Sequence, residues 1–157
     1  AGEIAISMKK INAIIHVDKT QNLVTTQTGR TAGEIQKAAN DAGMMAAIGQ
    51  AARVGVGFLL NGGFGHQTRL MGLGSDRVVG AEVVLADGSH VCVGNQPVSD
   101  PKSPDCDRKR LSHAQSEALL WAIRGAGPNF AVVLSLTVSM IDLRYADYNF
   151  QDFPLGK

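Results

Sequence analysis

A stretch rich in glycine is the part of this sequence best suited to contact a ligand through its main chain. Glycine occupies positions 49, 55, 57, 62, 63 and 65, and the residues between are mostly apolar. Because glycine lacks a Cβ atom, backbone N–H groups can closely approach an anionic or extended ligand. A glycine-rich turn packed tightly against a sheet would need the same residues, and the spacing alone does not decide between these two interpretations.

The glycine spacing disfavours two common nucleotide-binding motifs. Gly55 and Gly57 are not followed by a glycine three residues later, as the GxGxxG motif requires, and the sequence contains no GxxxxGK[ST] run. Residues 125–130 resemble the first motif, but they follow a predicted helix and precede a predicted strand, the reverse of the required order. A nicotinamide-binding Rossmann domain and a P-loop nucleotide triphosphatase are therefore disfavoured.

The other reactive side chains form no recognisable constellation. No Ser/His/Asp set and no pair of carboxylates has a spacing that supports hydrolysis. His66 follows Gly65, and a structural, hydrogen-bonded histidine is favoured there over a ligand contact. His90 and Cys92 lack a second half-site, so no metal site is expected. The pattern of Cys92 and Cys106 favours free thiols, with a disulfide across the intervening loop as the alternative.

The elements around the glycine-rich stretch alternate between strands and helices. Thr31 and Glu34 have the spacing of a capping box, Gly43 provides a helix stop, and Asp87-Gly88 is typical of a hairpin turn. We expect strands at residues 3–7, 13–17, 23–27, 78–85, 89–93 and 130–141, and helices at 31–42 and 116–124. This order predicts an α+β fold, with a mixed or antiparallel sheet backed by helices on one face.

Two of these elements carry further expectations about burial. In the last strand, apolar side chains alternate with Ser135, Thr137 and Ser139, which predicts one buried side. Trp121 lies at helical spacing from Ala118, which favours a core position.

Length and composition fit one ordinary globular domain. The chain has 157 residues, 45% of them hydrophobic and 18% charged, with a net charge of +1. We expect a single domain over residues 1–144, a surface loop at 95–115 and a tail at 145–157. The balanced charge argues against nucleic acid as a partner. No apolar run reaches the roughly 20 residues that span a bilayer, which predicts a soluble protein, either cytoplasmic or secreted.

Two longer runs resemble one known family. Residues 54–76, continued by 82–88, and residues 120–133 are similar to the corresponding runs of berberine-bridge-enzyme-like, vanillyl-alcohol-oxidase-type FAD oxidases, in the same order. The resemblance extends over roughly residues 3–141. It implies an FAD-binding domain of an oxidoreductase that acts on a small organic molecule, with this chain forming mostly its second subdomain.

The resemblance also implies which residues contact FAD. Eight residues between positions 54 and 66 would line the ribityl and pyrophosphate side of the cofactor: Val54, Gly55, Val56, Gly57, Gly62, Gly63, Gly65 and His66. Three later residues would meet its adenosine end: Asn129, Val132 and Val133.

The sequence departs from the family pattern at several positions. It contains no match to the histidine motif that tethers FAD, and Ala51 stands where some members have a second, cysteinyl attachment, so any FAD held by this chain would be non-covalent. Phe58 and Ala131 replace glycines that are usual in the family. The substrate domain, which supplies the catalytic base, is not in the sequence, so no catalytic residue is assigned.

Two alternatives therefore stay open at this point. One is a cofactor-free protein that binds or cyclises a small molecule in the vacated cleft. The other is a structural fragment that forms a homo-oligomer through the surface left uncovered by the missing subdomain.

Overall fold

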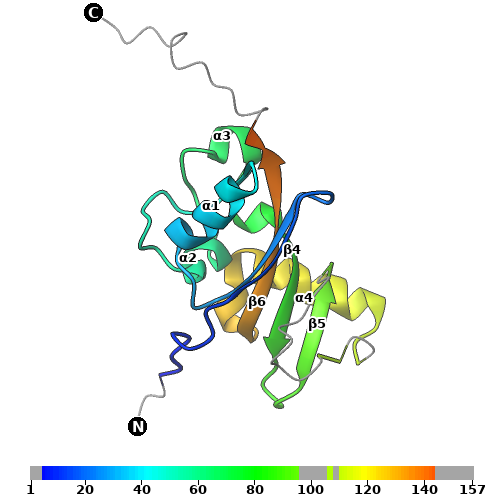
Figure 1. Ribbon diagram of the computed structural model, residues 1–157. Coiled ribbons are helices and arrows are strands. Elements are labelled where there is room, and N and C mark those ends of the chain that lie inside the picture. The colour runs from blue at the N-terminus through cyan, green and yellow to red at the C-terminus, as the bar shows by residue number, and fades with distance from the viewer. Residues whose placement is uncertain (1–4, 96–105, 108–109, 144–157) are drawn as a thin grey trace, which may run out of the picture.

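An antiparallel sheet organises the molecule (Figure 1). The computed structural model describes residues 5–95, 106–107 and 110–143. Five strands follow the order β1-β2-β6-β4-β5, and β3 pairs with β6 off this path. The strands are β1 (Ile14–Asp18), β2 (Leu23–Gln27), β3 (Met44–Ala46), β4 (Val78–Val84), β5 (His90–Gly94) and β6 (Val132–Asp142). The helices are α1 (Ala32–Asp41), α2 (Val56–Leu60), α3 (Thr68–Met71) and α4 (His113–Ala126), with 3-10 turns η1 (Ser75–Arg77) and η2 (Gly127–Asn129).

The main core lies between the sheet and the helices. Apolar side chains from β2, β4, β5 and β6 pack against buried residues of α1, α2 and α4, so that one face of the sheet is covered by helices. Fully buried members include Val24, Ile35, Val83, Ile123 and Leu136. The predicted α+β architecture, with a sheet backed by helices, is confirmed.

The local signals in the sequence account for several boundaries. Thr31 and Glu34 form the expected capping box at the start of α1, and Gly43 adopts a φ of +76° just after the helix. In the β4–β5 hairpin, Gly88 adopts a φ of +82°, a conformation that glycine tolerates without strain. These predictions from turn and cap chemistry are confirmed.

The second face of the sheet carries a buried polar layer rather than a solvent-exposed one. Thr25 and Thr137 share a hydrogen bond of 2.9 Å across β2 and β6. Glu82, only 2% exposed, accepts a hydrogen bond from the Ser135 hydroxyl at 2.9 Å and lies 2.6 Å from His90 Nε2. The prediction that β6 buries one side only is wrong, because these polar side chains satisfy one another between neighbouring strands.

Three further predictions differ from the structure. Residues 5–7 form no strand, while residues 3 and 4 lie outside the described part. Helix α4 begins at His113 rather than near 116, because Ser112 and Gln115 form a capping box at its start. Trp121 is 76% exposed and not part of the core. Most of the predicted 95–115 loop and the 145–157 tail also lie outside the described residues.

The expectation of free thiols is also wrong. Cys92 on β5 forms a disulfide with Cys106, with a Cα–Cα distance of 5.5 Å. Both residues are more than nine-tenths buried. The pairing joins the edge of the sheet to the segment that precedes α4.

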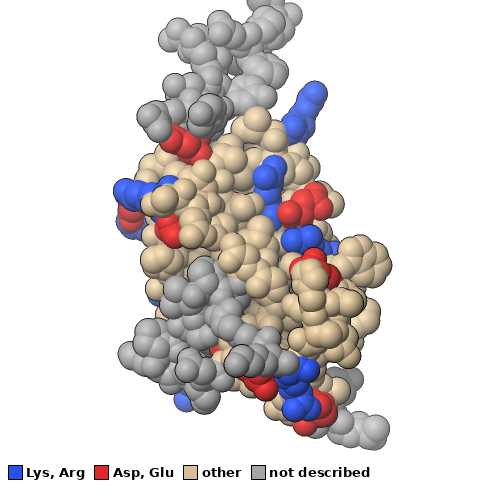
Figure 2. Space-filling view, turned by 90° about the vertical axis from the view of Figure 1, so that its right-hand side faces the viewer, with Lys and Arg blue, Asp and Glu red and all other residues tan. Residues whose placement is uncertain are grey.

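The surface mixes charges of both signs. Basic and acidic side chains lie interspersed on the face shown in Figure 2, and several form exposed pairs, such as Lys37 with Asp41 and Arg110 with Asp87. Among the described helices, none is both long and apolar enough to cross a membrane.

Candidate functional site

The glycine-rich stretch forms α2 and the loops on either side of it. Gly55 lies immediately before α2, Gly57 lies inside its first turn, and Gly62, Gly63 and Gly65 lie in the loop that leads to α3. The eight predicted contacts between Val54 and His66 therefore occupy one continuous region beside α1.

The glycines of this region divide into two groups by their surroundings. At Gly55, Gly57 and Gly62, an added Cβ atom would meet nothing within 4 Å. At Gly63 the same atom would lie 3.0 Å from the Leu59 Cα atom, and at Gly65 it would lie 2.6 Å from the Ile48 carbonyl oxygen. Both interpretations left open by the sequence thus apply: three glycines leave the main chain bare, and two permit close packing.

The two valines of this region, Val54 and Val56, differ in burial. Val56 is 3% exposed and packs into the core, so only its main chain is available at the surface. Val54 is half-buried, and its carbonyl oxygen accepts a hydrogen bond from the Ala32 N–H at 2.7 Å. The Ala52 carbonyl similarly accepts one from the Gly33 N–H at 2.9 Å. These two bonds fasten the segment before α2 to the first turn of α1.

Close packing at Gly33 makes this attachment possible. A Cβ atom there would lie 2.8 Å from the Ala52 Cβ atom, so a larger residue would separate the helix from the loop. No local pattern in the sequence predicts this contact, because Gly33 and Ala52 lie 19 residues apart along the chain.

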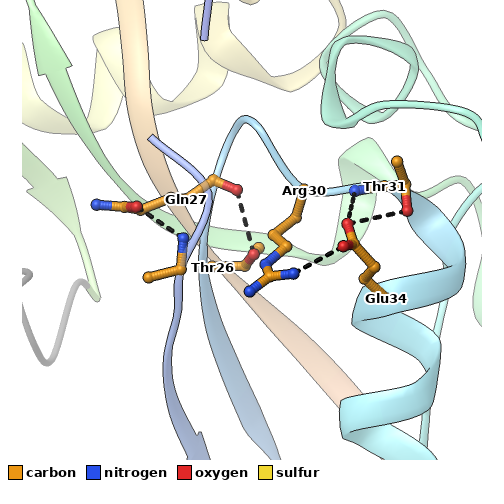
Figure 3. Close-up of polar contacts among 6 residues, drawn as sticks. Thr26, Gln27, Arg30, Thr31 and Glu34 are labelled. Carbon is orange, nitrogen blue, oxygen red and sulfur yellow. Dashed lines mark hydrogen bonds and ion pairs between the residues drawn. The ribbon is translucent and has the colours of Figure 1, made fainter. Parts of the chain in front are cut away.

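A polar network fixes the start of α1, as Figure 3 shows. Glu34 accepts hydrogen bonds from the Thr31 N–H at 2.9 Å, from the Thr31 hydroxyl at 3.1 Å and from Arg30 Nη1 at 2.7 Å. The Thr31 N–H, followed by the Arg30 guanidinium, lowers the pKa of the Glu34 carboxyl below its ordinary value. Beside it, Gln27 Oε1 accepts a hydrogen bond from the Ala13 N–H at 2.7 Å. The hydrogen bonds of Glu34 therefore cap the first turn of α1.

An open hollow of about 530 Å³ lies beside this attachment. Its walls come from α1, from residues 48–52 and from the start of the segment leading to α3, and they include Gly33, Gly49, Ala52, His66 and Gln67. Its size falls within the range of small-molecule sites. His66 is exposed and lines the hollow, so this residue is positioned to contact a ligand despite the structural role that the sequence favoured.

Gln36 lines this hollow and has a polar atom that is buried beneath its wall. Its Nε2 atom donates to Asn40 Oδ1 at 2.6 Å, whereas its Oε1 atom is buried and accepts no hydrogen bond from the described part of the chain. A buried acceptor without a partner is uncommon and costs free energy. No sequence pattern distinguishes Gln36, because it lies on a helix with ordinary amphipathic spacing.

The second predicted contact region lies where η2 leads into β6. Asn129 is exposed, Val132 is half-buried and Val133 is 94% buried. At Gly127, an added Cβ atom would lie 3.1 Å from the Leu60 side chain, so η2 packs against the end of α2. The fold therefore brings the two distant motifs next to each other, although Val133 itself is a core residue.

Ala51, which stands where some family members have a cysteinyl attachment to FAD, is exposed and lies just before the glycines. Across the ranges that the structure describes, no three His, Cys, Asp or Glu side chains gather where they could hold one metal ion.

A comparison with known protein families identifies this arrangement. Residues 1–94 match the family described as FAD binding domain. The chain belongs to this family. The sequence resemblance to berberine-bridge-like FAD-linked oxidoreductases is thereby confirmed.

Individual relatives agree with this assignment. The chain is 34% identical over 143 residues to (R)-6-hydroxynicotine oxidase of Paenarthrobacter nicotinovorans, covering 90% of this chain and 27% of the relative. It is 33% identical over 147 residues to the FAD-linked oxidoreductase fogF of Aspergillus ruber, and the match covers 93% of this chain and 25% of the relative. This FAD-binding chain thus spans about a quarter of the length of these curated relatives.

A solved structure shows the same fold at similar identity. Glucooligosaccharide oxidase from Acremonium strictum is 31% identical, with a TM-score of 0.68 over 85% of this chain and 24% of that protein. Its FAD is described as 6-S-cysteinyl, 8α-N1-histidyl, a covalent attachment at two points.

Proposed function

We propose that this FAD-binding chain forms part of the cofactor site of an oxidase that oxidises a small organic molecule. The observation that carries the proposal is the bare main chain at Gly55, Gly57 and Gly62. A hollow of ligand size, lined by Ala52 and His66 among others, lies in the same part of the fold. Flavin bound there would accept a hydride from the substrate, which is chemistry that the cofactor rather than the protein provides.

The main chain of the glycine-rich stretch would hold the extended part of FAD. Residues 54–57, with Gly62, Gly63 and Gly65, would lie along the ribityl and pyrophosphate groups. Phosphate oxygens would approach the main chain where it is bare, at Gly55, Gly57 and Gly62. His66 would approach the cofactor from the neighbouring hollow. Asn129, Val132 and Val133 would contribute at the adenosine end. Val133 would support this end from the core, because its side chain is buried and its carbonyl oxygen accepts a hydrogen bond from the Thr28 hydroxyl at 2.8 Å.

The charged side chains of the hollow largely cancel. Lys37 and Asp41, which both line it, pair with each other at 2.6 Å, so the wall offers no strong net charge. A largely neutral group is therefore the best match to the hollow.

We propose further that this chain holds FAD without a covalent bond. Ala51 cannot form the cysteinyl bond, and none of the chain's four histidines lies in the family's tethering motif. This proposal concerns the present chain only, because its relatives are about four times longer.

Titration of the purified chain with FAD tests the proposal. We expect quenching of flavin fluorescence, saturation at one FAD per chain, and release of all flavin into the supernatant on acid precipitation. Riboflavin, which lacks both phosphates and adenosine, serves as the control and should bind more weakly. Absence of any saturable FAD binding by a chain with native circular dichroism would contradict the proposal.

A further inference from the structure

Arg53 lies two residues before the bare main chain at Gly55. Its side chain is exposed, and it forms no hydrogen bond or ion pair with any residue that the structure describes. The cations of the neighbouring α1 region differ, because Arg30 and Lys37 lie 2.7 Å and 2.6 Å from a carboxylate oxygen. Arg53 therefore keeps the charge and the hydrogen-bond donors that the other two have already used.

Hydrogen bonds on both sides fix the main chain at Arg53. The carbonyl oxygens of the residues before and after it accept hydrogen bonds from the first turn of α1, at 2.9 Å and 2.7 Å. The Val54 N–H also donates to the Ala51 carbonyl oxygen at 3.0 Å, which closes a turn with Arg53 at its third position. The Arg53 side chain is thus presented from a backbone whose position α1 determines.

Exposure alternates along the five residues from 53 to 57. Arg53, Gly55 and Gly57 are exposed, whereas Val54 is half-buried and Val56 is 3% exposed. The Arg53 side chain and the bare main chain at Gly55 therefore lie on the outer surface of the same short segment. Two residues so close in sequence have Cα atoms at most about 7 Å apart, so a ligand at Gly55 lies within reach of the guanidinium.

We propose that Arg53 binds the pyrophosphate group of FAD and thereby positions the cofactor along the glycines. The inference rests on the proposed function, because it takes FAD as the ligand of the glycine-rich stretch. The pyrophosphate carries a negative charge on each phosphate, and main-chain N–H groups supply hydrogen bonds but no full positive charge. A guanidinium supplies both, in a planar fork that can donate two hydrogen bonds to one phosphate.

Titration of the whole chain with FAD, followed by flavin fluorescence at low and at physiological ionic strength, tests this role. Arg53→Gln should raise the Kd for FAD by on the order of 10-fold at low salt, because it removes a charge-assisted contact. Arg53→Lys keeps the charge but loses the planar fork, so its Kd should lie between those of the wild type and Arg53→Gln.

Lys19→Gln is the matched control. Lys19 is exposed in the turn between β1 and β2, which contributes no residue to the glycine-rich stretch or to the lining of the hollow. The substitution changes the net charge of the protein by the same amount as Arg53→Gln does. Its Kd for FAD should stay equal to that of the wild type.

Two further measurements separate a contact with the cofactor from an effect on the fold. Salt screens a contact between a guanidinium and a phosphate, so the wild type should lose affinity for FAD more steeply than Arg53→Gln as the salt concentration rises. Urea unfolding should give the same free energy for both proteins, because the Arg53 side chain has no partner to lose in the described part of the chain.

The failure of this inference can be distinguished from the failure of the proposed function. If the wild type binds FAD and Arg53→Gln binds it equally well at low salt, Arg53 does not contact the pyrophosphate, and the proposed function stands. If the correctly folded wild type binds no FAD, both fail. Equal losses of affinity in Arg53→Gln and Lys19→Gln would also overturn the inference, because the net charge of the protein would then account for the effect.

Discussion

Replacing Gly57 by alanine should change the stability of the protein and its affinity for FAD in opposite directions. Gly57 lies in α2, has no positive φ, and an added Cβ atom would meet nothing within 4 Å. Alanine also restricts the unfolded chain, so Gly57→Ala should raise the free energy of unfolding by about 0.4–1 kcal/mol. A ligand lying against the bare main chain would instead meet a new methyl group. The steric cost of about 1–3 kcal/mol corresponds to a roughly five- to 150-fold higher Kd for FAD.

Gly65→Ala is the matched control for this experiment. Its new Cβ atom would lie 2.6 Å from the Ile48 carbonyl oxygen, so it should lower the free energy of unfolding by about 1–3 kcal/mol. Urea unfolding measures the stability of both variants, and fluorescence titration measures their affinity for FAD. If Gly57→Ala is more stable than the wild type and binds FAD with unchanged affinity, the bare main chain at Gly57 does not contact the cofactor.

Three further predictions concern stability and pH. Thr31→Ala removes the N-cap of α1 and should cost about 1 kcal/mol in urea unfolding, whereas Thr31→Ser should retain most of that stability. Ile123→Ala leaves a cavity at a fully buried position and should cost about 2–5 kcal/mol, and a cost below 1 kcal/mol would contradict the described packing of α4. The Ser89 hydroxyl and N–H, followed by the Arg110 guanidinium, lower the pKa of the Asp87 carboxyl from 3.8 to about 2. Since the pKa is lower in the folded state, the stabilisation is present above pH 4 and is lost as the pH falls towards 2. In an NMR titration, Ser89→Ala should raise the Asp87 midpoint more than Arg110→Gln does, and equal midpoints in all three proteins would contradict this assignment.

The sequence predicted the elements whose signals are local. The capping box at Thr31, the helix stop at Gly43 and the hairpin turn at Gly88 depend on residues only a few positions apart, and the structure has all three. The alternation along β6 identified a strand but not its environment. Burial on the second face depends on the pairing of Glu82 with Ser135 and of Thr25 with Thr137, and these partners lie 53 and 112 residues apart.

The sequence predicted the part of the candidate site that depends on glycine residues. It did not predict the part that depends on which residues pack around those glycines. Glycine spacing identified the stretch, but it could not separate Gly57, which is bare, from Gly65, which is packed. The hollow beside it forms only because α1 contacts the segment at Ala52. No local sequence pattern predicts that contact. Gln36 was missed for the same reason.

The departure from the family pattern at Phe58 can be reconciled with a cofactor along the glycines. The half-buried Phe58 ring packs edge-on against Phe64, with the ring centroids 5.2 Å apart. On another side it lies over Gly49, where an added Cβ atom would be only 2.9 Å from the ring. Gly49 therefore accommodates the bulk that replaces the usual glycine, and an added Cβ at Gly55 would still meet nothing within 4 Å, the ring included. A phenylalanine at this position thus gives no reason to prefer a cofactor-free protein, because the ring occupies space next to Gly49 rather than next to the bare main chain at Gly55.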